Sequence, residues 1–164
     1  MVEFASNGGT AKGYLATPDG GRGPGVIVIQ EWWGLVPHIE DVCERFAAEG
    51  FLALAPDLYH GKVADTVAGA EVLTKTLDAN ASRAKAEVRE AAAFTSERAR
   101  HHDRGLAVIG FSLGAYYALD VSTTDAEDVR RVVIFYGTGR GDFSRSKAAY
   151  LGHFAQNDPY ESAA

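Results

Sequence analysis

Residues 105–114 read Gly-Leu-Ala-Val-Ile-Gly-Phe-Ser-Leu-Gly, and this stretch decides the fold. Its first half is rich in Leu, Val and Ile, which is typical of a strand buried on both faces. It ends in the pattern G-x-S-x-G at Gly110, Ser112 and Gly114, and residues 115–121 then predict a helix. A strand, a sharp turn and a helix form the context in which this pattern presents a serine nucleophile.

The turn predicts a specific chemistry for Ser112. Strained backbone angles are expected at the serine, while the flanking glycines let the strand and the helix pass closely. The hydroxyl should project from the carboxyl edge of a parallel sheet, with the Leu113 amide pointing to where an oxyanion forms. The alternative is a chance match in a chain with 18 glycines. The strand-to-helix context favours the nucleophile.

On both sides of this stretch, hydrophobic periodicity predicts alternating strands and helices. Further strands are expected over 2–4, 11–17, 25–30, 51–55, 131–136 and 149–155, and helices over 38–49, 63–77 and 81–100. The alternation predicts a single α/β domain over residues 1–164. We expect three layers: a mostly parallel sheet with helices on both faces.

Polar or glycine residues follow five of these strands, namely Glu31, Asp57, Ser112, Gly137 and Asp158. In open parallel sheets, ligands bind beyond the carboxyl ends of the strands. We therefore expect a functional site at this edge.

Composition narrows the classes of partner. The net charge of −6 argues against nucleic acid and anionic membrane surfaces. The single cysteine, Cys43, excludes an internal disulfide and indicates a reducing compartment. We expect a cytoplasmic protein because no signal peptide or membrane-length apolar run is present. No metal or cofactor is expected, since His153, Asp158 and Glu161 have no recognised ligand spacing.

Five segments together resemble the dienelactone hydrolase family of the α/β-hydrolase fold. They are Gln30 to Gly34, Pro56 to Tyr59, Gly110 to Gly114, Tyr136-Gly137 and Gly152 to Asp158. Their order and spacing fit along nearly the whole chain, which is far more specific than the serine turn alone.

The resemblance implies a role for each matched residue. Ser112 stands where the best-known members carry a cysteine nucleophile, and Glu31 is a second carboxylate that contacts the nucleophile. Asp158 is the triad acid, and the amides of Leu113 and Trp32 form the oxyanion hole. From its chemistry alone, a glutamate is a poor base toward serine unless burial raises its pKa.

The substrate pocket and the catalytic base are less defined by the sequence. Aromatic and polar candidates for lining the pocket are Trp33, Tyr59, His60, Phe111 and Tyr136. The triad of this fold runs Ser, Asp or Glu, then His, but no histidine follows Asp158 here. Among the five histidines, only His60 is expected near the site: His101 and His102 precede the serine strand, His153 lies in a strand and His38 starts a helix.

These observations predict a hydrolase of small carboxylic esters or lactones that uses Ser112 and is weak or inactive without its histidine. The alternative is a non-catalytic α/β module that binds a ligand or partner. Because the family fold continues beyond the strand at 149–155, we expect an open sheet edge carrying Leu151 and Phe154. Either a homo-oligomer covers this edge or the chain is a fragment of a longer protein.

Overall fold

The computed structural model describes residues 1–6, 9–100, 104–125 and 127–160. The histidines His101 and His102 lie outside this part. The strands are β1 Val2–Ser6, β2 Gly9–Ala16, β3 Gly25–Ile29, β4 Leu52–Pro56, β5 Leu106–Phe111, β6 Val129–Phe135 and β7 Ala149–His153. The helices are α1 Pro37–Ala48, α2 Val67–Ala79, α3 Ala81–Arg98 and α4 Leu113–Thr124.

The strands form one sheet in the order β1-β2-β4-β3-β5-β6-β7. The pairs from β4 to β7 are parallel, while β1 and β2 form an antiparallel hairpin whose second strand pairs with β4. The strand order therefore switches sides at β3: β4 is added on one side of it and the next strand, β5, on the other. Ligands bind at such switch points in open α/β sheets.

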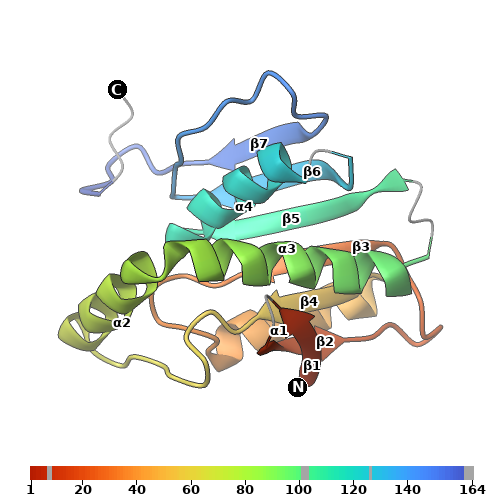
Figure 1. Cartoon of the computed structure of the whole chain (residues 1–164), viewed down its shortest axis with the longest axis horizontal. Coiled ribbons are helices and arrows are strands. Elements are labelled where there is room, and N and C mark those ends of the chain that lie inside the picture. Colours follow the sequence, from red (N-terminus) through yellow and green to blue (C-terminus); the bar gives the residue numbers. More distant parts are fainter. Residues whose placement is uncertain (7–8, 101–103, 126, 161–164) are drawn as a thin grey trace.

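Helices cover both faces of the sheet, as the sequence predicts (Figure 1). Alternation along β3 divides its side chains: Ile27 and Ile29 join the core under α3 and α4, whereas Val26 and Val28 face α1. All four side chains are essentially inaccessible to water, which explains the unbroken β-branched run in this central strand. Cys43 packs in the α1 layer as a buried free thiol.

The ends of α2 and α4 lie two to four residues from the predicted ones. α2 begins at Val67 instead of residue 63, because Val63 bridges to Gly34 and the Thr66 hydroxyl accepts the Gly69 amide as an N-cap. α4 begins at Leu113, directly after the serine, and extends to Thr124.

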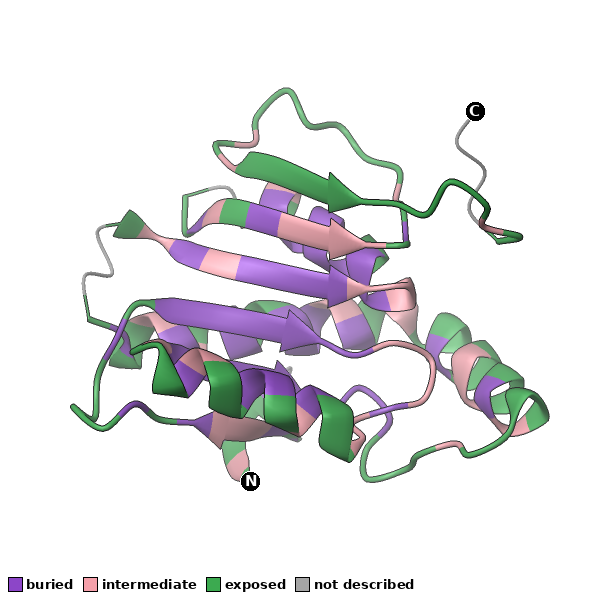
Figure 2. Ribbon diagram, turned by 180° about the vertical axis from the view of Figure 1, so that it is seen from behind, coloured by how far each residue is buried: buried purple, intermediate pink, exposed green. Residues whose placement is uncertain are grey.

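The end of the sheet at β7 is poorly covered. All five residues of β7 are exposed. On the face of the sheet that α1 covers, this helix packs against β2, β4 and β3, which form the half of the sheet away from β7 (Figure 2). Leu151 and Phe154 remain 54% and 55% exposed. The predicted open apolar edge is therefore present in the described structure.

Candidate active site

Ser112 occupies the strained turn between β5 and α4. Its φ of 50° and ψ of −117° are unusual for a residue with a side chain. The close packing requires glycine: a Cβ at Gly114 would lie 2.5 Å from the carbonyl oxygens of Gln30 and Ile29, and one at Gly110 would overlap the Gly114 backbone. The structure thus contains the turn that the G-x-S-x-G pattern predicts.

Strand register places one polar residue on each side of Ser112. Ile29 of β3 pairs with Gly110 of β5, so Glu31 and Ser112 both leave the sheet two residues later. On the other side the Ser112 amide donates to the Phe135 carbonyl at 2.9 Å, which sets Tyr136 beside the serine. These three residues come from adjacent strands and form the centre of the candidate site.

The electrostatics of this centre follow from partial burial. Burial raises the pKa of Glu31, and the nearby His38 opposes this shift by favouring the carboxylate. Burial also raises the pKa of Tyr136, with a further contribution from the negative charge of Glu31. The Glu31 carboxyl and the Tyr136 phenol are therefore close enough to interact electrostatically.

The N-terminus of α4 provides the positive end of a helix dipole at Ser112. Leu113 is the first helical residue, and the Ser112 side chain makes no capping bond. Across from it, Trp32 lies in the turn after β3. The Ala64 amide donates to the Trp33 carbonyl at 2.9 Å, so this turn is attached to the loop after β4.

The segment after β7 crosses toward this turn. The ring centroid of Tyr160 lies 6.3 Å from that of Trp32. Because β5 and β6 separate β7 from β3, the intervening chain runs across their carboxyl ends. Asp158, two residues before Tyr160, accepts the Tyr160 amide at 2.8 Å and is half-buried.

Three other predicted positions lie elsewhere. The Asp57 carboxylate is buried and accepts the amides of Tyr59 and Gly61 at 3.2 and 2.5 Å, so it shapes its own loop. Tyr59 is 5% exposed and bonds to Thr74. Tyr59 and His60 line a cavity whose lining does not include Ser112 or Glu31. The histidine that interacts with Glu31 is His38, contrary to the expectation that only His60 lies near the site.

Phe111 belongs to a row of rings on the α1 side of the sheet. It stacks on Phe135 at 5.0 Å, and Phe135 stacks on His153 at 4.6 Å. His38 completes the row at 6.5 Å from Phe111. Alternation along each strand predicts which face Phe111 and Phe135 lie on. Only the register of β5 and β6 shows that the two rings are neighbours.

A sequence model of the dienelactone hydrolase family matches residues 11–164. The chain belongs to the dienelactone hydrolase family. A relative called protein usf, from Aquifex pyrophilus, is 38% identical over 141 residues, which is 84% of this chain and 61% of that protein. A carboxymethylenebutenolidase from a Pseudomonas species is 33% identical over 171 residues, covering 97% of this chain and 70% of the enzyme.

Solved structures resemble this dienelactone hydrolase family member over most of its length. A Klebsiella pneumoniae protein described as a dienelactone hydrolase has a TM-score of 0.71 at 26% identity, covering 92% of this chain and 70% of that one. A dienelactone hydrolase-like phosphotriesterase from metagenomic libraries has a TM-score of 0.83 at 22% identity, covering 99% and 70%. The chain spans 61% of the length of its two Aquifex relatives.

Neither a metal site nor a membrane-spanning helix occurs among the described residues. No group of three or more His, Cys, Asp or Glu side chains in this part is arranged to hold a metal ion. No helix within the same residues is long and apolar enough to cross a membrane.

Proposed function

We propose that this chain hydrolyses small carboxylic esters or lactones with Ser112 as the nucleophile. The strained turn that carries Ser112 between β5 and the N-terminus of α4 is the observation that supports this most strongly. Strain at such a position persists only where the surrounding structure maintains it, and it is concentrated at functional sites. Membership in the dienelactone hydrolase family supports the same reaction class.

The proposed reaction begins with attack of the Ser112 Oγ on the substrate carbonyl carbon, while Glu31 takes the serine proton. The carbonyl oxygen becomes an oxyanion held by the Leu113 and Trp32 amides and by the helix dipole. Collapse breaks the acyl–oxygen bond and leaves an acyl-serine, and the leaving alkoxide takes the proton from Glu31. Water then attacks the acyl-serine and releases the carboxylic acid with regeneration of Ser112.

Glu31 is the proposed acceptor of the serine proton in this polypeptide. It leaves the sheet on the strand adjacent to Ser112, and burial raises its pKa, which makes its carboxylate a stronger base. Asp158 is the proposed triad acid, the group that orients the histidine in a complete triad. No described residue hydrogen-bonds the Ser112 hydroxyl, so we expect slow turnover. Loss of a triad member typically leaves roughly 10³–10⁴-fold acceleration over water.

A second candidate function is favoured by the same hydroxyl, because no described side chain hydrogen-bonds it. In that case the chain is a non-catalytic module that binds a small ligand or a partner. Such a module needs no activated serine, so reactivity of Ser112 distinguishes the two functions.

The test is labelling with a fluorophosphonate, followed by intact-mass measurement. We expect one adduct on the wild-type chain and none on Ser112→Ala. The matched control, Ser144→Ala, removes an exposed serine from a loop and should label normally. An adduct that persists in Ser112→Ala would exclude Ser112 as nucleophile, and no adduct on the wild type would favour the binding module.

A further inference from the structure

The cavity lined by Tyr59 and His60 lies between the loop after β4 and the helices α2 and α3. It encloses about 230 Å³ and is lined by Leu58, Tyr59, His60, Lys62, Leu73, Thr76, Leu77 and Arg83. For comparison, a cavity of about 150 Å³ accommodates benzene. The space therefore suits a ligand of a few heavy atoms rather than a large one.

One side of this cavity is basic. His60, Lys62 and Arg83 contribute the titratable cationic groups, and no acidic side chain is part of the lining. Among the described residues, no carboxylate pairs with Lys62. The side chains of His60 and Arg83 are 39% and 49% exposed, so the basic side is open to solvent.

Glu87 of α3 holds two of these groups in place. Its side chain is only 6% exposed, and its Oε1 lies 3.3 Å from His60 Nε2 and 3.5 Å from Arg83 Nε. The carboxylate thus fixes both bases. Because an arginine has five N–H donors and only Nε meets Glu87, further donors remain for a ligand.

The loop that carries His60 is rigid for its length. Asp57 accepts the amides of Tyr59 and Gly61, and His60 itself has a left-handed φ of 55°. A side chain in this conformation is uncommon and costs free energy. The opposite side of the cavity is apolar, with Leu58, Leu73 and Leu77.

We propose that this cavity binds a small carboxylate with a short apolar chain, at a site separate from Ser112. Arg83 and Lys62 bind the carboxylate, His60 contributes a ring N–H, and the three leucines pack against the chain. Bidentate pairing with a planar carboxylate is the geometry that a guanidinium favours. The proposal does not depend on the chemistry of Ser112.

The test is a titration of the ¹⁵N-labelled protein with sodium butyrate, followed by amide chemical shifts. We expect saturable shifts at the amides of His60, Thr76 and Arg83. Butyramide, the uncharged analogue, should bind at least tenfold more weakly, and inorganic phosphate, which lacks an apolar chain, should also bind more weakly. Equal binding of butyramide or phosphate would overturn the assigned ligand class.

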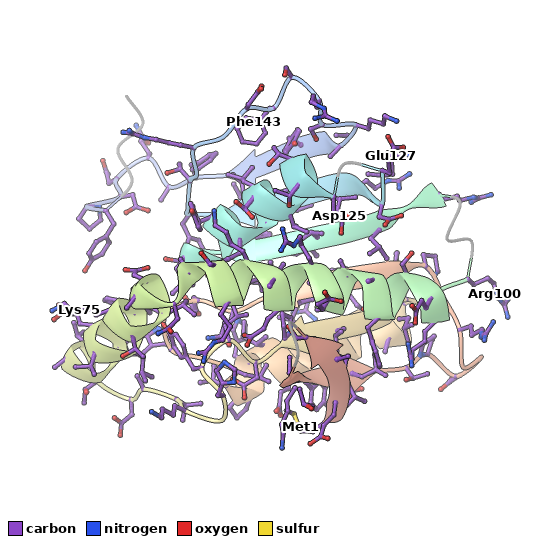
Figure 3. All side chains as sticks on the ribbon, in the orientation of Figure 1. Met1, Lys75, Arg100, Asp125, Glu127 and Phe143 are labelled. Carbon is purple, nitrogen blue, oxygen red and sulfur yellow. The ribbon has the colours of Figure 1, made fainter. Side chains whose placement is uncertain are left out.

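Variants localise the binding. Arg83→Gln should weaken butyrate about tenfold, as expected for the loss of a hydrogen-bonded charge. Lys62→Met, at an exposed position, should weaken it by a smaller factor. The control Lys75→Met alters an exposed lysine of α2 outside the lining (Figure 3) and should bind normally.

Two outcomes would overturn the site itself: no saturable shifts with butyrate, or unchanged affinity in both Arg83→Gln and Lys62→Met. Ser112→Ala should bind butyrate like the wild type. Loss of binding in Ser112→Ala would place the butyrate in the candidate active site instead. A failed fluorophosphonate test leaves this result unaffected, so the two proposals fail independently.

Discussion

The ring of Tyr160 packs edge-on against the ring of Trp32, with centroids 6.3 Å apart. These residues lie on segments that follow β7 and β3, which are separated by two strands in the sheet. The contact therefore carries the chain across the carboxyl ends of β5 and β6. It brings the segment that contains Asp158 toward the same edge as Ser112 and Glu31.

Removal of this ring should expose the tryptophan turn. In Tyr160→Ala we expect stronger acrylamide quenching of tryptophan fluorescence, because Trp32 loses a neighbour on one side. The chain has only two tryptophans, Trp32 and Trp33, so the signal reports on this turn alone. Phe154→Ala, which removes an exposed ring from the same segment, should leave quenching unchanged. Equal quenching in both variants would contradict the packing.

Gly114→Ala should destabilise the fold strongly. The added methyl group would lie 2.5 Å from two backbone carbonyl oxygens of the neighbouring strand and loop, neither of which can move freely. We expect a loss of about 3 kcal/mol in the free energy of unfolding, measured by urea denaturation. The control is Gly20→Ala, where a Cβ meets nothing within 4 Å. Similar stability of both variants would show that the turn is less tightly packed.

Ser112→Gly should be more stable than Ser112→Ala. The serine has φ 50°, a conformation that glycine adopts without steric cost and alanine does not. We expect an advantage of about 1 kcal/mol for the glycine variant in urea denaturation, since strain of this kind costs about 1–3 kcal/mol and glycine loses more backbone entropy. A glycine variant that is no more stable than the alanine variant would argue against strain at this turn.

Stability should depend on pH through Glu31. Burial raises its pKa in the folded state, so the folded chain binds more protons than the unfolded chain between the two pKa values. Stability from this group is therefore complete below the ordinary glutamate pKa and is lost as pH rises through the folded value. In Glu31→Gln the side chain does not titrate, so the variant does not lose stability in this way as the pH rises.

Thermal unfolding at several pH values tests this prediction. The melting temperature of Glu31→Gln relative to the wild type should increase from pH 4 to pH 7. Glu71→Gln, at an exposed position of α2, should show no such trend. A Glu31→Gln difference that stays constant with pH would mean that Glu31 is not buried as described.

The uncovered strand β7 should cause self-association. Leu151 is 54% exposed on a strand with a free edge, and such edges pair with other chains. By light scattering coupled to size exclusion, we expect concentration-dependent oligomers that Leu151→Lys reduces. Val72→Lys is the control, because Val72 is 62% exposed on α2, far from β7 in sequence. A wild-type chain that stays monomeric at high concentration would contradict this prediction.

Local patterns were sufficient for the elements and for the serine turn. The run from Gly105 to Gly114 predicted the strand, the turn and the helix, and the β-branched run before Gln30 predicted a central strand. The predicted start of α2 was wrong by four residues, because Val63 bridges to Gly34, which lies 29 positions earlier in the chain. Periodicity within a segment contains no information about such a bridge.

The sequence by itself determined the α/β class, the parallel sheet edge and the glycine-flanked Ser112, since each depends on residues close together in the chain. The family resemblance already implied that Glu31 lies beside Ser112. Only the tertiary structure decided that Tyr136 flanks the serine on the other side, through the register of β5 and β6. It also decided that Glu87 of α3 holds His60 of the β4 loop. Such contacts join residues that are far apart in sequence, and side-chain packing between strands and helices selects them.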